Sequence, residues 1–575
     1  MVNAVIDGKK VSVPENTPIL EAARAAGIDI PTLCYYKDLN DIGACRVCVV
    51  EAEGCERLLT ACNNAVEDGM VIHTDSPKAR KARRMNVELI LSRHDSSCTT
   101  CVRSGNCKLQ SLANDLNITS VPFEKELPPA GGASVFPLQR DSSKCIKCFR
   151  CVQVCDKIQS VNIWDMTEQG PRADVGVSRA YSLEESDCAL CGQCITHCPV
   201  GALYERDDTE KVLSAIDDPE KTVMFQIAPS IRTAWGEYFG LSADTADEQL
   251  LAAVLRRMGA DYVFDTNFAA DLTIMEEGSE FVEKLKRPEG EKFPLFTSCC
   301  PGWVRFLKAH YPEFTDNLST AKSPQQMFGA VAKSYWAELT GTDPHNIFCV
   351  SVMPCVAKKH ECALGSMNDA CGDADVDVSL TTRELVRMIR AARIDPSAME
   401  KQPLDRPLGT YTGAGNIFGA SGGVMEAALR SAHFLVTGED PDPDMFSEVR
   451  GMEGVKERVY DIAGRKIRTA VVNGLGNADK LLGALKSGKA NYDFVEVMAC
   501  PGGCVGGGGQ PIHEGEFMAA KRAPVLYRQD KASSLRFSHK NPDVAKLYSD
   551  YLERPLSEKS HHLLHTDHHA WDMPV

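Results

Sequence analysis

The stretch CIKCFRCVQVC at residues 145–155 is repeated as CALCGQCITHCP at residues 188–199, and this repeat decides the fold of its region. Each copy spaces its cysteines as C-x2-C-x2-C-x3-C. Thiolates this close on a tight loop can hold three corners of a [4Fe–4S] cubane, and the fourth cysteine reaches the other cluster. The repeat predicts two cubanes, one held by Cys145, Cys148, Cys151 and Cys198, the other by Cys188, Cys191, Cys194 and Cys155. Zinc is the alternative, but it usually takes two separated C-x2-C pairs.

Composition places the repeat in a large intracellular protein. The chain has 575 residues, which favours several domains at ~100–200 residues each. Its 24 cysteines are more typical of metal ligands in a reducing cytosol than of a small disulfide scaffold. The formal charge of −16 disfavours nucleic acid and anionic lipid. No apolar run approaches the ~18 residues of a membrane span. We therefore expect a cytoplasmic protein with no nucleic-acid partner and no membrane partner.

A first group of cysteines follows a predicted hairpin around Asp7-Gly8 and a short helix that Gly27 ends. These four residues resemble the ligands of a plant-type [2Fe–2S] ferredoxin, with a longer first gap: Cys34, Cys45, Cys48 and Cys62. Their spacing is similar to that of the N-terminal domain of [FeFe]-hydrogenases and of the iron–sulfur subunit of respiratory NADH dehydrogenase. Cys55 competes for a ligand role, and we interpret it as a small packed residue.

A second group has the less common pattern H-x3-C-x2-C-x5-C, formed by His94, Cys98, Cys101 and Cys107. The same two families use this pattern for a [4Fe–4S] cluster with one histidine ligand. A neutral imidazole in place of a thiolate removes negative charge and should raise the potential of the cluster. Four clusters in about two hundred residues would lie close enough for electrons to hop between them, which predicts a relay towards something buried.

Three further motifs indicate what lies at the end of that relay: TSCCPGW at 297–303, MPCVAKKHE at 353–361 and EVMACPGGC at 496–504. They closely resemble the signature motifs of [FeFe]-hydrogenases, in the family's order. With the N-terminal groups, the resemblance covers nearly the whole chain. The chain is similar to the large monomeric form of these hydrogenases found in clostridia. The resemblance implies an H-cluster, a cubane joined to a two-iron subsite with carbon monoxide, cyanide and azadithiolate, whose cubane ligands are Cys300, Cys355, Cys500 and Cys504, with Cys504 bridging.

The resemblance also implies the surroundings of that cofactor. Lys358 and Ser230 are expected as donors to cyanide, and Pro229 adjoins Ser230 in QIAPS. The expected apolar wall consists of Met353, Pro354, Phe418 and Met498, although these could equally be ordinary core residues. The glycine-rich run GGCVGGGGQP at 502–511 is expected to let backbone approach the cofactor closely.

A proton path is the third implication. Cys299 matches the family's terminal proton donor. A thiol suits that role because it exchanges protons near neutral pH, where a hydroxyl does not. DLTIMEEGSEFVEKL at 271–285 predicts a helix that presents Glu277 and Glu280 on one face, and Ser319 could bridge them. The implied order is Cys299, a water, Glu277, Ser319, Glu280 and solvent. A solvated helix face is the alternative interpretation of the two glutamates.

These predictions define a multidomain α/β and α+β protein. Residues 1–79 would form a β-grasp [2Fe–2S] ferredoxin-like domain, 80–120 a [4Fe–4S] domain with one histidine and three cysteine ligands, and 121–208 a bacterial ferredoxin-like domain with two [4Fe–4S] clusters. Residues 209–575 would form the α/β H-cluster domain, ending in a histidine-rich tail interpreted as a surface extension. The Pro- and Gly-rich segment 122–134 is a predicted linker. Three other thiols are interpreted as core or incidental: Cys349, Cys362 and Cys371.

The implied activity is reversible oxidation of H2 to protons and electrons, with ferredoxin as electron donor or acceptor and dedicated maturases to build the two-iron subsite. One alternative is a hydrogenase subunit of an NADH-linked, electron-bifurcating complex. Another is a non-catalytic electron-transfer, H2-sensing or assembly protein. A pure electron-transfer subunit would not need TSCCPGW or EVMACPGGC, and the presence of Cys299 and Lys358 favours catalysis over sensing.

Overall fold

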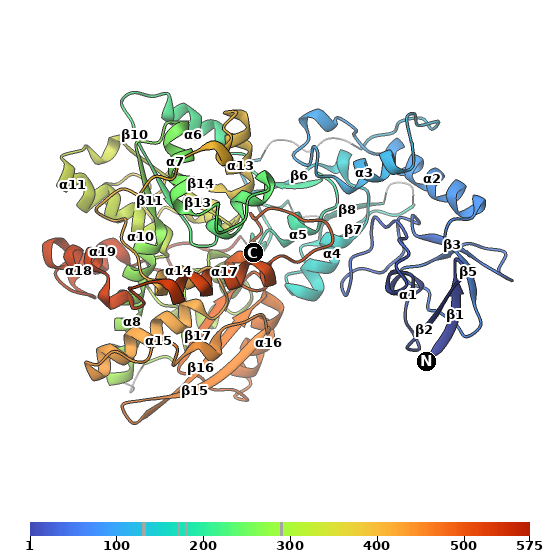
Figure 1. Ribbon diagram of the computed structural model, residues 1–575. Helices are drawn as coiled ribbons and strands as arrows, with labels where there is room; N and C mark the ends of the chain where they lie inside the picture. The colour runs from blue at the N-terminus through green and yellow to red at the C-terminus, as the bar shows by residue number, and fades with distance from the viewer. Residues whose placement is uncertain (129–133, 171–172, 179–181, 288–290, 575) are drawn as a thin grey trace. The chain divides into compact units, whose positions relative to one another are not determined.

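The computed structural model describes residues 1–128, 134–170, 173–178, 182–287 and 291–574 (Figure 1). The chain forms two compact units. The first unit contains residues 1–157, 162–182 and 197–204, and the second contains residues 158–161, 183–196 and 205–575. None of the 24 cysteines forms a disulfide bond with another described residue. Among the described helices, none combines the length and the apolar character needed to cross a bilayer.

The first unit begins with a sheet in the strand order β2-β1-β5-β3-β4, drawn in dark blue in Figure 1. The predicted hairpin around Asp7-Gly8 is confirmed, because β1 and β2 pair antiparallel there, and the predicted helix is α1. Gly27 follows α1 with a φ of +69°, a conformation that glycine adopts without strain. The elements are β1 (Val2–Ile6), β2 (Lys9–Val13), α1 (Ile19–Ala25), β3 (Val49–Ala52), β4 (Leu59–Thr60) and β5 (Val71–His73).

The rest of the first unit consists of short elements between cysteine-bearing loops. Helix α2 begins at Pro77, and the side chain of Ser76 caps it by accepting a hydrogen bond from the Ala79 amide at 3.2 Å. The described residues 122–128 and 134 of the predicted linker lie in neither helix nor strand, and its residues 129–133 lie outside the described residues. The elements are α2 (Pro77–Ser92), α3 (Lys108–Asp115), β6 (Leu138–Arg140), α4 (Arg150–Gln153), β7 (Trp164–Thr167) and β8 (Asp174–Val177).

Two buried polar side chains hold the loop of the first cysteine group against the loop of the repeat within this unit. Arg150 donates to the carbonyl oxygens of Leu33 at 2.8 Å, Cys34 at 3.0 Å and Tyr35 at 2.8 Å. Asn40 donates to the carbonyls of Cys34 at 2.7 Å and Cys148 at 3.0 Å. Both side chains are buried, so these hydrogen bonds replace ones that water would otherwise make.

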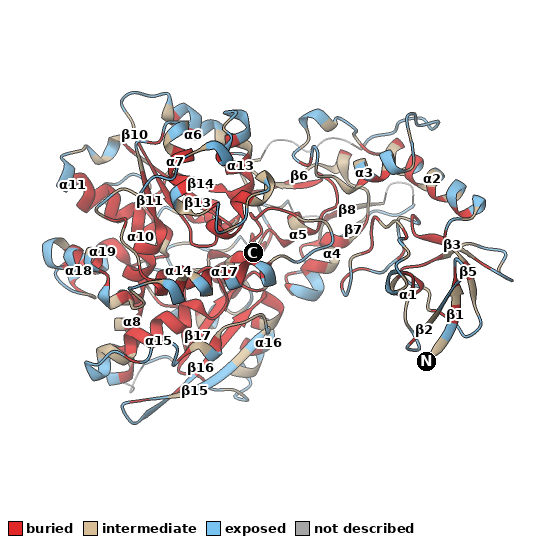
Figure 2. Cartoon of the chain, in the orientation of Figure 1, coloured by how far each residue is buried: buried red, intermediate tan, exposed pale blue. Residues whose placement is uncertain are grey.

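The second unit contains a parallel sheet in the order β11-β10-β13-β14. Its strands are nearly continuous apolar runs because helices cover both faces, and Figure 2 shows them largely buried. The predicted helix at EQLLAAVLRRMG is α7, which Asp247 caps and Gly259 ends. The strands are β10 (Thr222–Ile227), β11 (Tyr262–Asp265), β13 (Ile347–Met353) and β14 (Val378–Thr381).

A second sheet of this unit has the order β12-β17-β16-β15, in which β17 pairs parallel with both of its neighbours. The carboxyl ends of β12 and β17 lead directly into the predicted motifs TSCCPGW and EVMACPGGC. Ligand sites in α/β proteins form at such strand ends. The strands are β12 (Leu295–Phe296), β15 (Val455–Ile462), β16 (Arg465–Asn473) and β17 (Phe494–Met498).

Helices pack around these sheets, and the longest is α8 (Thr266–Lys286), which confirms the helix predicted at residues 271–285. Most of α8 is buried, as Figure 2 shows. The others are α5 (Gln193–His197), α6 (Thr209–Ile216), α7 (Glu248–Met258), α9 (Pro301–His310), α10 (Pro324–Val331), α11 (Ala337–Thr340), α12 (Ala357–Glu361), α13 (Thr382–Ala391), α14 (Gly413–Ile417), α15 (Gly423–Thr437), α16 (Leu475–Lys486), α17 (Ala519–Ala532), α18 (Pro542–Leu547) and α19 (Glu558–Leu564). The remaining strand, β9 (Leu203–Glu205), pairs with β6.

The interpretation of the histidine-rich tail as a surface extension is wrong for His565 and His568, whereas His561, His562 and His569 are exposed as expected. His565 and His568 are 6% and 9% exposed, and the intervening Thr566 is half-buried. The ammonium group of Lys308 lies 3.9 Å from the centre of the Trp571 ring and holds the end of the tail. The pattern HHLLHTDHH has neither helical nor strand periodicity throughout, so its sequence does not indicate which histidines are buried.

We predict that Arg150→Met lowers the unfolding free energy of the first unit by about 2–5 kcal/mol, because buried carbonyls lose their charged donor. Chemical denaturation followed by circular dichroism measures this loss. Arg93→Met is the matched control, since Arg93 forms an exposed ion pair with Glu126 at 2.8 Å. Equal midpoints for the two variants would contradict the structural role of Arg150.

Candidate active site and cluster sites

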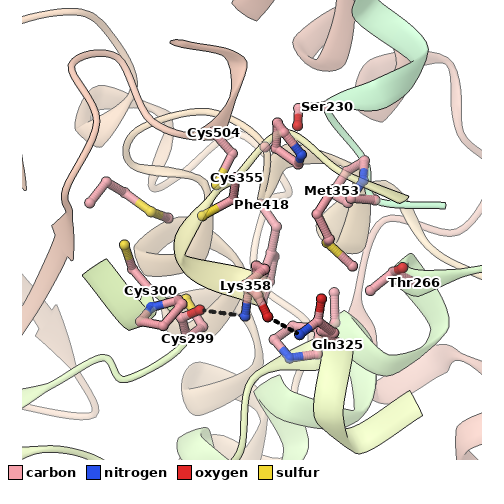
Figure 3. A pocket seen from close by; sticks show the side chains of 18 residues that line it. Ser230, Thr266, Cys299, Cys300, Gln325, Met353, Cys355, Lys358, Phe418 and Cys504 are labelled. Carbon is pink, nitrogen blue, oxygen red and sulfur yellow. Dashed lines mark hydrogen bonds between the residues drawn. The ribbon is translucent and has the colours of Figure 1, made fainter. Parts of the chain in front are cut away.

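A cavity of about 80 Å³ lies in the second unit where the strand ends of both sheets meet (Figure 3). The loops after β10, β11, β13, β12 and β17 all contribute to its wall. Sequence-predicted site residues form most of it: Pro229, Ser230, Cys299, Cys300, Met353, Pro354, Cys355, Lys358, Phe418, Met498 and Cys504. The motifs, which are far apart in the sequence, therefore converge on one place.

The thiols of Cys300, Cys355, Cys500 and Cys504 form an electrostatically coupled group at this cavity. Burial is the main cause that raises the pKa of each, and the charges of neighbouring thiolates add to it for three of them. For Cys504 those neighbours are Cys300, Cys355 and Cys500. The pKa of Cys355 is raised to about 12. Several thiolates this close and this buried require a cation to balance them, as a metal cluster does.

The backbone around the sulfurs supplies donors that a thiolate cluster uses. The Ala499 amide donates to Sγ of Cys300 at 3.4 Å. Backbone amides at the start of α12 hydrogen bond to Cys355, and the Gly508 amide does so to Cys500, which lowers the pKa of each thiol against the effect of burial. Hydrogen bonds to ligand sulfurs also tune the potential of a bound cluster.

The glycine-rich run at 502–511 packs closely against other backbone, and its expected approach to a cofactor stays a prediction. A Cβ on Gly507 would lie 2.2 Å from the Pro354 carbonyl oxygen, and one on Gly508 would lie 2.3 Å from that of Cys191. The glycines therefore allow close packing of this loop against two other cysteine-bearing loops of the second unit. That packing holds Cys500 and Cys504 beside Cys355.

Two polar groups in the cavity fit a bound polar ligand. Ser230 is completely buried, and among the described residues its hydroxyl has no hydrogen-bond partner, which is costly unless a ligand supplies one. Lys358 donates to Glu361 at 2.8 Å and to the Cys299 carbonyl at 3.1 Å. Burial lowers the pKa of Lys358, but the charge of Glu361 outweighs this and the net pKa is raised, so Lys358 stays cationic.

Most of the remaining wall is apolar, and the sequence did not indicate all of its residues. Met353, Pro354, Phe418 and Met498 all line the cavity, as predicted, and they are buried. The missed residues include Thr266, at the end of β11, and Gln325, which donates to the Lys358 carbonyl at 3.4 Å and to Glu361 at 3.0 Å. Other missed residues are Ala228, Ala270, Pro301, Pro324 and Gly419. Their position after strands or at helix starts was the available signal.

The predicted proton-relay residues lie together beside the cavity. Ser319 donates to Glu280 at 2.7 Å, and Glu277 contacts Ser319 and the backbone of Ser298. Burial, and then the charge of Glu280, raise the pKa of Glu277 to about 8. Glu277 is 1% exposed, so the alternative of a solvated helix face is wrong for it. One oxygen of Glu277 has no partner among the described residues, which leaves an acceptor for the expected water.

The N-terminal cysteine quartet is also assembled. The Cys34 amide donates to Sγ of Cys45 at 3.4 Å, and a hydrogen bond from Cys34 lowers the pKa of Cys45. A hydrogen bond from Cys62 likewise lowers the pKa of Cys48. Cys55 donates instead to the Arg57 carbonyl at 3.3 Å and is only half-buried, so it lies apart from these thiols.

His94 is oriented as a metal ligand would be. Its Nδ1 lies 3.0 Å from the Lys144 carbonyl oxygen, which leaves Nε2 as the ligand atom when Nδ1 carries the proton. Burial lowers the pKa of His94, so the imidazole is neutral. A Cβ on Gly201 would lie 2.5 Å from Sγ of Cys101, so the repeat and this site pack closely within the first unit.

The repeat divides between the units. Cys145 and Cys148 interact electrostatically with Cys198 in the first unit, as the prediction requires for one cubane. Cys188, Cys191 and Cys194 belong to the second unit and Cys155 to the first, so the other ligand set stays a prediction from the spacing. Within the second unit, Sγ of Cys500 lies 3.6 Å from the Cys191 carbonyl oxygen.

Family models match successive parts of the chain. The "Iron only hydrogenase large subunit, C-terminal domain" matches residues 221–508, and the "Iron hydrogenase small subunit" matches residues 516–571. The chain belongs to the iron-only, or [FeFe], hydrogenase family. Its N-terminal part matches a "2Fe-2S iron-sulfur cluster binding domain" at 1–77, the "NADH-ubiquinone oxidoreductase-G iron-sulfur binding region" at 83–122 and a "4Fe-4S dicluster domain" at 144–202.

Two curated hydrogenase relatives match almost end to end. The NADP-reducing hydrogenase subunit HndD of Solidesulfovibrio fructosivorans is 46% identical over 98% of this chain and 98% of its own length. Iron hydrogenase 1 of Clostridium pasteurianum is 40% identical over 98% of this chain and 99% of its own length. A solved [FeFe]-hydrogenase, a variant of HydA1 from Chlamydomonas reinhardtii, is 40% identical with a TM-score of 0.57, covering 64% of this chain and 98% of that one.

The predicted fold class is confirmed: this [FeFe]-hydrogenase is a multidomain α/β protein with [2Fe–2S], [4Fe–4S] and hydrogenase domains. Iron–sulfur clusters and an H-cluster are its family's cofactors. The residues of the cavity fit such a cofactor, because thiols, an unsatisfied buried hydroxyl and a buried ammonium group meet there.

We predict that Cys299→Ser lowers H2 evolution by about 10²- to 10⁴-fold with little change in iron content, because a hydroxyl holds its proton far more tightly than a thiol. Gas chromatography of H2 produced from a reduced viologen measures the rate. Cys371→Ser is the matched control, since Cys371 lies outside the cavity and is half-exposed. A fully active Cys299→Ser enzyme would remove Cys299 from the path.

We predict that Glu277→Gln lowers the same rate by about 10²-fold or more at unchanged iron content, because an amide cannot pass on a carboxyl proton. In the unmodified enzyme, proton delivery should fall as the pH rises through about 8, where Glu277 loses its proton. Glu283→Gln, on the exposed face of the same helix, is the control. If Glu277→Gln and Glu283→Gln evolve H2 equally fast, Glu277 is not a relay residue.

Proposed function

We propose that this chain catalyses the reversible oxidation of H2 to two protons and two electrons at an H-cluster held in the cavity. The observation that carries the proposal is the convergence of Cys300, Cys355, Cys500 and Cys504, with Cys299 beside them. The first four of these cysteines would hold the cubane, and Cys504 would also bridge to the two-iron subsite. Cys299 would not be a ligand. When bound, the H-cluster would supply the iron site, which accepts two electrons when H2 is cleaved and donates two when H2 is formed.

The chain's own residues would position the cofactor and keep water away from it. Ser230 and Lys358 would donate hydrogen bonds to its polar ligands, because the hydroxyl is unsatisfied and the ammonium group is buried. Met353, Phe418 and Met498 would exclude water, which strengthens each of those interactions in a medium of low polarity.

Proton transfer would run from solvent to Sγ of Cys299. Glu280 and Ser319 are already joined at 2.7 Å, and Glu277 contacts Ser319 on its other side. A water on the unsatisfied oxygen of Glu277 would complete the connection to Cys299. A carboxyl group with a pKa of about 8 can both hold and release a proton near neutral pH, as a relay requires.

Electrons would leave through one [2Fe–2S] and three [4Fe–4S] clusters at the ligand positions predicted from the sequence. The contact between Sγ of Cys500 and the Cys191 carbonyl supports an exit from the cubane through the second half of the repeat. We propose ferredoxin as the electron partner, maturases for assembly of the two-iron subsite and a cytoplasmic location.

A second candidate is a hydrogenase subunit of a nucleotide-linked, electron-bifurcating complex. HndD, named as an NADP-reducing hydrogenase subunit, matches this chain over nearly its whole length at 46% identity. In that case the same cavity would act on H2, while another subunit would hold the nucleotide site.

One experiment tests the proposal and separates the candidates. The chain is purified without oxygen from a host with and without [FeFe]-hydrogenase maturases, and H2-driven reduction of ferredoxin and of NADP+ is followed by absorbance. We expect matured protein alone to reduce ferredoxin, protein from the host without maturases to be inactive, and neither to reduce NADP+. Ferredoxin reduction only when partner subunits are added would favour the complex. No H2 oxidation with any acceptor, viologens included, would refute the proposed activity.

A further inference from the structure

The C-terminal tail packs along the segment that carries Ser319. The Lys322 amide donates to the Leu564 carbonyl at 2.8 Å, and the Thr566 amide donates to the Thr320 carbonyl at 2.8 Å. Ala321 and His565 pair as antiparallel neighbours between these two hydrogen bonds. The tail is thus joined to the relay segment by a single antiparallel bridge with a backbone hydrogen bond on each side.

At this bridge, the His565 imidazole joins two separate parts of the chain. Its Nε2 lies 3.1 Å from Oε2 of Glu276 on α8, and its Nδ1 lies 2.8 Å from Oγ1 of Thr320. Glu276 directly precedes Glu277, and Thr320 directly follows Ser319. One buried side chain therefore links the helix of the relay glutamates to the segment of the relay serine.

Glu276 is a fixed anchor for this link and not a further relay group. Its carboxylate also accepts hydrogen bonds from the Tyr548 hydroxyl at 2.5 Å, the Leu556 amide at 2.9 Å and the Ser560 hydroxyl. Burial raises the pKa of Glu276, but the hydrogen bond and charge of His565 outweigh it, and the net pKa is below the ordinary value. The carboxylate stays ionised, so it can hold the imidazole in one place.

A second tail histidine restrains Ser319 itself. Nε2 of His568 lies 2.8 Å from the Ser319 carbonyl oxygen. Burial lowers the pKa of His568, so a neutral imidazole donates this hydrogen bond. The backbone of Ser319 is thereby fixed, while its hydroxyl contacts Glu280.

We propose that His565 is a positioning residue that sets the distance between Ser319 and the relay glutamates of α8, so that the tail is part of the proton-transfer machinery. The proposal rests on the proposed function for its kinetic consequence. Its physical basis is that a hydrogen bond weakens steeply as distance and angle depart from the optimum, and that proton transfer needs a heavy-atom distance of about 2.6–3.2 Å. Ser319 is the single hydroxyl described between Glu277 and Glu280, so a small shift would open the relay.

The test compares His565→Ala with His565→Gln, because an amide can still donate to Glu276 and accept from Thr320. His562→Ala is the matched control, since His562 lies in the same tail and is exposed. Turnover of H2 and its solvent deuterium isotope effect are measured across pH. The charged and titratable groups that face His565 are Glu276 and Glu280 on α8 and His561 on α19.

We expect His565→Ala to lower H2 turnover about tenfold or more, with unchanged iron content and a larger isotope effect, because proton transfer becomes rate-limiting. His565→Gln should restore turnover to within about threefold of the unmodified enzyme, and His562→Ala should not differ from it. Equal rates and isotope effects in all variants would overturn the proposal, as would a His565→Gln enzyme that folds and loads iron yet is as slow as His565→Ala.

Two further measurements test the proposal if His565→Ala does not fold or if the matured protein does not turn over H2. If His565→Ala fails to fold, Thr320→Val removes only the hydroxyl contact at nearly constant volume, and we expect at least about a threefold loss with the same isotope signature. In protein that carries the cubane but was never matured, infrared spectroscopy follows the protonated carboxyl band of Glu277. A pH midpoint that moves in His565→Ala but not in His562→Ala supports the positioning role even if the matured protein does not turn over H2, and an unmoved midpoint contradicts it.

Discussion

Mutual repulsion among buried thiolates is the constraint on which the catalytic part of this structure depends. The carboxyl ends of β12, β13 and β17 bring Cys300, Cys355, Cys500 and Cys504 together, and all of these except Cys500 line one cavity with a mostly apolar wall. Burial and neighbouring charge raise their pKa values, so the thiolate form is stable there only when a cation balances it. Much of the neighbouring sequence, including the glycines that pack against Pro354 and Cys191, serves to bring these four sulfurs together.

The proposed electron and proton routes would approach this site from different elements. The electron side is built from loops with closely spaced cysteines, and within the second unit Cys191 contacts Cys500 directly. The proton side is built from α8, the segment around Ser319 and the tail that braces it. Because the two routes share few residues, a substitution in one can be expected to leave the other intact, which makes the roles separable by experiment.

The sequence predicts a ligand set because cluster binding is encoded in local spacing, and the structure brings Cys300, Cys355, Cys500 and Cys504 together. His94 was recognisable for the same reason, and the structure adds the hydrogen bond to the Lys144 carbonyl that orients it. The sequence did not reveal Thr266 and Gln325, since the end of β11 and the start of α10, and not motifs, bring them to the cavity. The sequence also did not indicate that part of the tail is buried. His565 and Glu276 belong to polar stretches that are typical of solvent-exposed segments, and only tertiary packing brings the two side chains together.

The most direct measurement is infrared spectroscopy of the protein after anaerobic maturation. If the four thiolates hold an H-cluster, the spectrum will contain cyanide and carbonyl stretching bands from iron-bound ligands, and Cys504→Ala will lose them while the accessory clusters remain. Fully iron-loaded, matured protein without any such bands would contradict the account.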